Sequence, residues 1–135
     1  MIGYSLQHGM LRTFKVERII KATLTTQQFI RPDTIDLERL LQYAWGVWYG
    51  EDPVEVRLRF YGTAANRVRE TIWHPLQRIE DLADGNLEWT VQIAGVRELI
   101  PWIRGWGPDC EVLAPAELRE LIATDMHRAA ELYRE

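Results

Sequence analysis

From residue 54 to residue 135, the sequence predicts an α+β domain of the ferredoxin-like class, β-α-β-β-α-β, with an extra C-terminal helix. Stretches with an apolar residue at every second position alternate with stretches whose apolar residues recur at helical spacing. Gly and Pro signals separate these stretches, and Asp84-Gly85 marks a tight hairpin between the second and third strands. In this order, two helices cover one face of a four-stranded antiparallel sheet.

The residues before 54 are predicted to form a short β-hairpin and a linker that contains a helix. Residues 2–8 and 11–20 are the two strands, with His8-Gly9-Met10 as the turn. Neither face of the second strand is cleanly apolar, so we expect both strands to belong to a larger sheet. Residues 21–34 are a connector, and an apolar stripe at helical spacing predicts a helix from about residue 33 to about residue 45.

Within the ferredoxin-like region the apolar pattern predicts seven elements. In chain order they are a strand over 54–61, a helix from 64 to 74, strands over 76–82 and 87–93, a helix after Gly95, a strand over 110–113 and a helix after Pro115. Pro101 falls inside the second helix and is expected to kink it, because proline removes one backbone hydrogen bond. The open face of the sheet is expected to carry Arg57, Arg59, Tyr61, Thr90 and Gln92.

The composition is typical of a globular protein. Apolar residues make up 47% of the chain and six residues are tryptophan, which is enough for a hydrophobic core. The formal net charge of −4 argues against non-specific nucleic-acid binding, which needs broad phosphate neutralisation. The single cysteine fits a reducing compartment. No signal peptide is recognisable, and no apolar stretch approaches the ~18–20 residues of a membrane span. We therefore expect a cytoplasmic protein that does not bind membranes.

No enzymatic site is predicted. The three histidines are scattered and no metal-ligand spacing such as H-x-x-x-H or C-x-x-C occurs, so we expect no metal ion. Cys110 lies between Asp109 and Glu111, and their charges would raise the thiol pKa and disfavour a catalytic thiolate. A phosphate-binding loop, a dinucleotide fingerprint and a nucleophile elbow are all missing, so we expect no cofactor.

Two parts of the chain resemble known segments of one family. Residues 11–19, Leu-Arg-Thr-Phe-Lys-Val-Glu-Arg-Ile, resemble the closing strand of the WYL domain, and Ile2-Gly3-Tyr4 resembles the strand before it. From residue 54 onward the chain resembles the WYL C-terminal extension, WCX. The signatures are Trp73-His74-Pro75, Asp84-Gly85, residues 102–107 and residues 112–119. The resemblance implies the last two strands of a WYL domain in residues 1–22, a linker in 23–53 and a WCX domain in 54–135.

This resemblance implies the C-terminal, ligand-sensing and dimerising portion of a bacterial WYL-type transcriptional regulator. In that family a winged-helix DNA-binding domain comes first, and we expect it to be absent from this chain. The expected partners are a second copy of the chain, a nucleic-acid or nucleotide-like effector, and operator DNA only through the winged helix. The alternative is a stand-alone ferredoxin-like domain that interacts with protein or RNA.

Arg12, Lys15 and Arg18 are the first candidate binding residues. The resemblance implies that basic side chains of this strand form a patch that senses a nucleic acid or a nucleotide-like ligand. Guanidinium groups bind phosphate in a bidentate manner, and several together create a local positive field. Arg12 and Arg18 share strand parity, whereas Lys15 does not. The alternative reading is an ordinary solvated strand.

Arg57 and Arg59 are the second candidate pair. With Tyr61 they would give the open sheet face basic and aromatic groups, which can stack bases in RNA-binding sheets. Only one aromatic residue is present, so an interface with another domain or a solvated polar face is the alternative.

Trp45, Trp48 and Tyr49 are predicted to make a dimer or interdomain contact. Together with the Leu-rich predicted helix they form a larger apolar surface than a short linker can bury. We therefore expect them to pack against another domain or a second chain.

Overall fold

The computed structural model describes residues 1–29, 38, 41–46 and 52–134 of the chain. They divide into two compact units, Met1–Leu37 and Glu38–Glu135. Residues 33–37 and 39–40 of the predicted linker helix, together with Trp48 and Tyr49, lie outside the described residues.

The first unit contains the predicted hairpin in a shorter form. Strands β1 (Ile2–Ser5) and β2 (Met10–Thr13) pair antiparallel, and Gly9 takes the positive φ of +64° that its turn requires. Residues 16–18 form a 3-10 turn, η1 (Val16–Arg18), so the prediction of a continuous strand over 11–20 was wrong. As a result Arg12 and Arg18 do not share a strand face.

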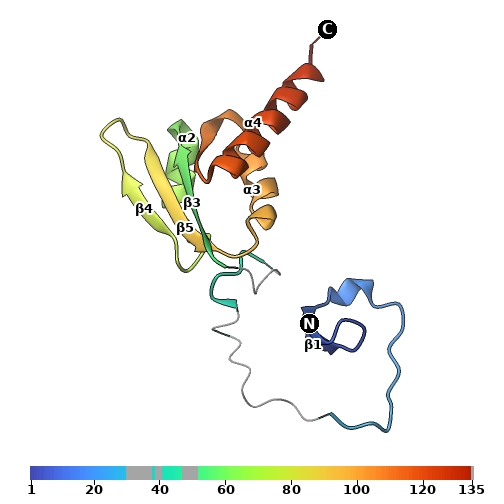
Figure 1. Cartoon of the computed structure of the whole chain (residues 1–135). Coiled ribbons are helices and arrows are strands. Elements are labelled where there is room, and N and C mark those ends of the chain that lie inside the picture. The colour runs from blue at the N-terminus through green and yellow to red at the C-terminus, as the bar shows by residue number, and fades with distance from the viewer. Residues whose placement is uncertain (30–37, 39–40, 47–51, 135) are drawn as a thin grey trace. The chain divides into compact units, whose positions relative to one another are not determined.

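The second unit has the predicted split β-α-β topology (Figure 1). Strands β3 (Val54–Phe60), β4 (Arg78–Asp81), β5 (Leu87–Ile93) and β6 (Cys110–Ala114) pair antiparallel in the order β4-β5-β3-β6. Within residues 52–134 its α-helices are α2 (Gly62–Arg69), α3 (Ile100–Gly105) and α4 (Ala116–Glu131), and short 3-10 turns η2 (Val96–Glu98) and η3 (Gly107–Asp109) flank α3. This arrangement confirms the predicted ferredoxin-like α+β class.

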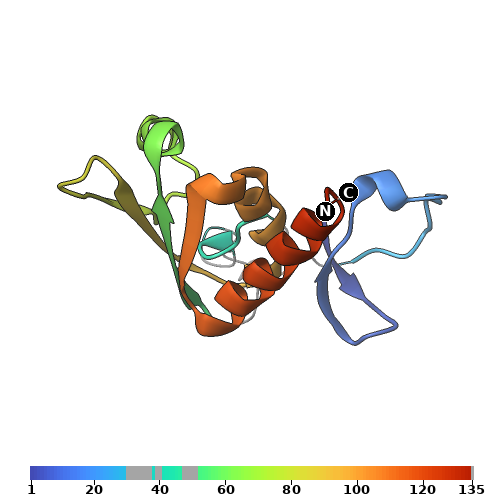
Figure 2. The same ribbon diagram turned by 90° about the horizontal axis from the view of Figure 1, so that it is seen from above.

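One face of the sheet forms the hydrophobic core. Apart from Val54 at the start of β3, which is 38% exposed, the alternating apolar residues of β3 and β5 point inward and are almost completely buried, as their period of two predicts. Helices α2 and α3 and turn η2 supply the opposing layer, and Figure 2 shows α3 and α4 side by side on one side of the sheet. An ion pair between Arg104 and Asp125 joins α3 to α4. The core residues include Val56, Leu58, Phe60, Val68, Leu87, Trp89, Val91, Ile93, Leu99 and Ile103.

The first helix of the ferredoxin-like region, predicted over residues 64–74, is shorter than expected. Helix α2 ends at Arg69, and Ile72, which was expected on its buried stripe, is 81% exposed. The Gln77 side chain explains the early end. Its Oε1 accepts hydrogen bonds from the backbone N–H groups of Trp73 and His74, at 2.6 and 3.0 Å, and its Nε2 donates to the Thr71 carbonyl. These hydrogen bonds give the backbone groups of residues 71, 73 and 74 the partners that further helical turns would otherwise supply.

Pro101 does not kink a helix. The stretch after Gly95 is divided into the 3-10 turn η2 and the separate short helix α3, and Pro101 stands at the start of α3. At that position its missing N–H costs nothing, because the first N–H groups of a helix have no internal partner.

The far end of α4 extends beyond the core. Leu118 and Ile122 are buried in the first half, but Leu132 and Tyr133, just after the helix, are more than 80% exposed. Tyr133 was predicted to lie on the buried stripe, and that prediction was wrong. With 16 residues α4 is the longest helix described, and none of the described helices has the length and apolar run that a bilayer crossing requires.

Candidate functional site

The open face of the sheet carries the predicted arginines, already paired with a carboxylate. The Arg59 guanidinium donates to Glu88 Oε1 at 2.5 Å, and Arg57 Nη2 lies 4.0 Å from the other Glu88 oxygen. The hydrogen bond to Glu88 raises the pKa of Arg59. A ligand would have to compete with Glu88 for Arg59, whereas Arg57 is held only loosely. Ligand binding by these two residues stays a prediction.

A second ionic group occupies the β6 side of the same face. The Tyr61 hydroxyl donates to Glu111 Oε2 at 2.5 Å, and Arg119 Nη1 lies 2.8 Å from Glu111 Oε1. These contacts lower the pKa of Glu111, mainly through the Tyr61 hydrogen bond and then through Arg119. The Tyr61 hydroxyl is thus already hydrogen-bonded to Glu111, and the negative charge of Glu111 is balanced by Arg119.

Within residues 1–29, the basic residues of the first unit are exposed. Arg12 Nη1 lies 2.8 Å from His8 Nε2, and His8 Nδ1 lies 2.9 Å from the Ser5 hydroxyl. Because a guanidinium can only donate, His8 Nε2 accepts and its Nδ1–H donates to Ser5. In the part of the chain that the structure describes, no carboxylate pairs with Lys15 or Arg18. These two side chains remain available for an anionic ligand.

The linker is docked onto the second unit at residues 43–46, where the sequence predicted the end of a helix. The Tyr43 carbonyl accepts a hydrogen bond from the Ala94 N–H at 2.8 Å, and Ala44 forms a parallel bridge with Ala94. The Gly46 N–H donates to Glu98 Oε2 at 3.1 Å. The predicted helical end was therefore wrong, because the backbone here pairs with a residue distant in sequence.

Trp45 contacts the ferredoxin-like domain of its own chain. Its ring centroid lies 5.1 Å from that of Trp102, 6.1 Å from that of Trp89 and 6.3 Å from that of His74, to which it is parallel within 7°. Trp45 thus packs within the second unit, against the domain that follows the linker, and its role at an interdomain contact stays a prediction. Contact with a second chain stays a prediction.

Trp45 belongs to an aromatic cluster that also contains Phe60, Trp73, Trp89, Trp102 and Trp106. The buried indole N–H groups of Trp73, Trp89 and Trp102 have no hydrogen-bond acceptor. Each of these rings has a nearly perpendicular aromatic neighbour: Trp106 for Trp73 and Trp102, and Trp45 for Trp89. In that geometry an N–H can point at the π face of its neighbour, which offsets part of the lost hydration.

His74 connects this cluster to the linker. It is 3% exposed, its Nδ1 accepts a hydrogen bond from the Leu76 N–H at 3.1 Å, and its ring hydrogen-bonds the backbone of Ala44. Burial lowers the pKa of His74, although the Ala44 contact opposes the shift. The imidazole is therefore neutral in the folded protein, with Nδ1 as acceptor.

We expect the domain to lose stability in mild acid. Because the pKa of His74 is lower in the folded than in the unfolded state, its contribution is complete above the unfolded value of about 6.5 and is lost as the pH falls through the folded value. Guanidinium titrations followed by tryptophan fluorescence, at about pH 7.5 and about pH 5, would measure the change. His74→Gln should flatten the pH dependence. An unchanged slope in His74→Gln would contradict the assignment.

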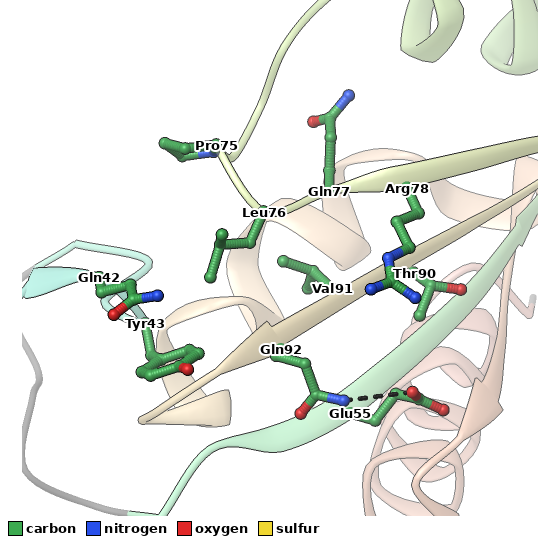
Figure 3. Close-up of a pocket in the computed structure, with 10 residues that line it drawn as sticks. All are labelled: Gln42, Tyr43, Glu55, Pro75, Leu76, Gln77, Arg78, Thr90, Val91 and Gln92. Carbon is green, nitrogen blue, oxygen red and sulfur yellow. Dashed lines mark hydrogen bonds between the residues drawn. The ribbon is translucent and has the colours of Figure 1, made fainter.

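A cleft of about 410 Å³ opens between the linker and the sheet (Figure 3). Gln42 and Tyr43 supply its linker side, the loop before β4 supplies its apolar wall, and strands β3, β4 and β5 supply its polar floor. The lining residues are Gln42, Tyr43, Glu55, Pro75, Leu76, Gln77, Arg78, Thr90, Val91 and Gln92. Of these, Thr90 and Gln92 were predicted on the open face. The cleft itself was missed, because it exists only once the linker docks.

Comparisons with known proteins identify a family and a likeness to solved structures. The sequence profile of the WCX domain matches residues 52–130. A search of curated proteins gave no match. Among solved structures, the chain is similar to proteasome accessory factor B/C (PafBC) of Arthrobacter aurescens, with 21% identity and a TM-score of 0.49. The alignment covers 96% of this chain and 20% of that one, so this chain spans about one fifth of its length.

Proposed function

The chain belongs to the WCX domain family, and from this premise we propose that it is the C-terminal, ligand-sensing and dimerising portion of a bacterial WYL-type transcriptional regulator. The observation that carries the proposal is the WCX match, which spans nearly the whole ferredoxin-like domain. The exposed apolar residues of the strands β1 and β2 add support, because a hairpin with Tyr4 61% and Met10 58% exposed is suited to completion by further strands. The role is regulatory and cytoplasmic, without catalysis.

The proposed mechanism is a shift between two states of a dimer. An anionic, nucleotide-like effector would bind Arg12, Lys15 and Arg18, and a winged-helix domain encoded upstream would bind the operator. The effector can shift the DNA-binding state only by the difference in its affinity for the two states. The WCX domain would contribute the contact between the two copies.

The decisive experiment is to sequence the locus upstream of the Met1 codon and translate it in frame. An open frame that encodes a winged helix and the front of a WYL domain supports the proposal. A stop codon followed by a ribosome-binding site would leave the stand-alone interaction domain. Sedimentation of the purified chain tests dimerisation directly.

Removing the two arginines of the basic patch should weaken anion binding. We expect Arg12→Ala combined with Arg18→Ala to reduce affinity for a fluorescein-labelled single-stranded oligonucleotide by about tenfold, because each guanidinium offers charge-assisted bonds to phosphate. Fluorescence polarisation measures the change, and the salt dependence should become shallower. Arg97→Ala, an exposed arginine outside the patch, is the matched control. Equal losses in both variants would indicate non-specific attraction and contradict the assignment.

A further inference from the structure

The floor of the cleft in Figure 3 is organised by strand register into two rows of side chains. Thr90 of β5 is opposite Arg57 of β3 on one side and opposite Arg78 of β4 on the other. Two residues further along β5, Gln92 is opposite Glu55 of β3. Residues two apart on a strand point to the same face, so a cationic row and an anionic row lie next to each other on the open side of the sheet.

The cations of the first row are available. In the described part of the chain no carboxylate pairs with Arg78, and Arg57 is 4.0 Å from its nearest carboxylate oxygen. Figure 3 shows the Arg78 side chain extending from β4 to a position beside Thr90. Arg57, which is outside the residues that line the cleft, and Arg78 are the cross-strand neighbours of Thr90, so both guanidinium groups are within reach of a carboxylate bound beside Thr90.

The second row can accept a positive charge. Gln92 Nε2 donates to Glu55 Oε2 at 3.2 Å, so the amide orients the carboxylate, and among the described residues nothing pairs with its other oxygen. Beyond this row, Tyr43 and the half-buried Leu76 form a mainly apolar end of the cleft. Gln77 takes no part, because its amide is committed to the loop backbone.

The spacing of the rows selects the length of the ligand. Two residues along a strand correspond to about 7 Å. An extended dipeptide spans about the same distance between its ends, whereas the two charges of a free amino acid are much closer together. We propose that this cleft is a binding site for a free dipeptide, with the carboxylate between Arg57 and Arg78, the ammonium at Glu55 and the N-terminal side chain against Tyr43 and Leu76.

Occupation of the site would strengthen the docking of the linker. Tyr43 belongs to the linker, while the charged groups belong to the sheet, so the ligand contacts both at once. A ligand that binds only when the linker is docked stabilises the docked state by mass action. This site is separate from the basic patch of the first unit, and it does not depend on the presence of an upstream DNA-binding domain.

The test is calorimetric titration of the full chain with the dipeptide leucyl-alanine. We expect a dissociation constant of about 1 mM or tighter and a change in tryptophan emission, because Trp45 lies in the same docked linker segment as Tyr43, two residues along the chain. Arg78→Gln and Glu55→Gln should each weaken binding by about tenfold, a modest factor because the groups are partly solvated. Arg97→Gln and Glu117→Gln, both exposed and outside the cleft, should bind as the unmodified chain does.

Blocked ligands identify which charge meets which residue. N-acetyl-leucyl-alanine should bind weakly to the unmodified chain and should lose nothing further in Glu55→Gln. Leucyl-alanine amide should behave in the same way with Arg78→Gln, and free leucine should bind more weakly than the dipeptide. Absence of binding at about 10 mM dipeptide, or equal affinity in Arg78→Gln and Arg97→Gln, would overturn the proposal.

Discussion

Replacing Trp89 by alanine should lower the free energy of unfolding by about 3–5 kcal/mol, enough to unfold a substantial fraction of a marginally stable domain. Trp89 is 0% exposed on the inner face of β5, between Leu58 of β3 and Ile79 of β4. Its ring lies 5.2 Å from that of Trp102 and 6.1 Å from that of Trp45. Alanine would leave a cavity beneath the aromatic cluster that the sheet cannot close. Denaturant titration measures the loss.

Two further variants separate packing from the indole N–H. Trp89→Phe should cost less, about 1–2 kcal/mol, because it keeps most of the ring and removes an N–H that has no acceptor. Ile72→Ala, at a position 81% exposed, should change stability by no more than about 0.5 kcal/mol. A loss in Trp89→Ala as small as that in Ile72→Ala would contradict the central place of Trp89 in the core.

The thiol of Cys110 should be almost inert in the folded protein. Burial, and then the charge of the adjacent Glu111, raise its pKa from 9.0 to about 12. At about pH 8 this reduces the thiolate fraction by about a thousandfold, and the thiolate is the species that reacts. Iodoacetamide labelling followed by mass spectrometry should be slow in buffer and fast in guanidinium chloride. Because the chain has a single cysteine, the label reports one site.

The same pKa has a consequence for stability at high pH. The protonated thiol is favoured by folding, so its contribution is complete below the unfolded pKa of about 9 and is lost as the pH rises toward the folded value. Cys110→Ala should therefore be less sensitive to alkaline conditions than the unmodified chain. Labelling in native buffer at a rate within about tenfold of the unfolded rate would show that the thiol is accessible and contradict its burial.

The sheet was predictable because each of its long strands has a clear period of two. In β5, Leu87, Trp89, Val91 and Ile93 alternate with polar residues, and the structure buries all four. The Asp84-Gly85 turn then indicated a hairpin between β4 and β5. The order of strands and helices along the chain is that of the split β-α-β topology, which could therefore be predicted.

The wrong predictions of helix boundaries have local and distant causes. Some arise from contacts between residues distant in sequence, and others from side chains that take the place of backbone hydrogen bonds. Gln77 satisfies the loop that follows α2, so an apolar residue at helical spacing, Ile72, is not helical. The linker pairs with Ala94, a partner that no local pattern reveals. Pro101 stands at the start of a helix because a separate 3-10 turn precedes it. One long kinked helix and a 3-10 turn followed by a short helix give the same spacing of apolar residues, so the sequence pattern could not distinguish them.

The candidate site was partly predictable for the same reasons. Strand alternation placed Arg57 and Arg59 on the open face, but their different relations to Glu88 depend on the register between β3 and β5. Arg78 was missed because β4 is short, and the sequence does not reveal that Arg78 is opposite Thr90 in the sheet. Tyr43 entered the cleft only through the docked linker.

The two outer strands of the sheet leave little for another molecule to extend. Strand β4 has only four residues, and Arg78, Glu80 and Asp81 are charged. On the opposite edge, Arg119 of α4 donates to the Val112 carbonyl at 2.6 Å, and Pro115, which has no N–H, follows β6 directly. Short, charged or occupied edges resist the edge-to-edge pairing that leads to fibrils. A concentrated solution of the folded domain should therefore resist β-aggregation, despite the unusual aromatic content of its interior.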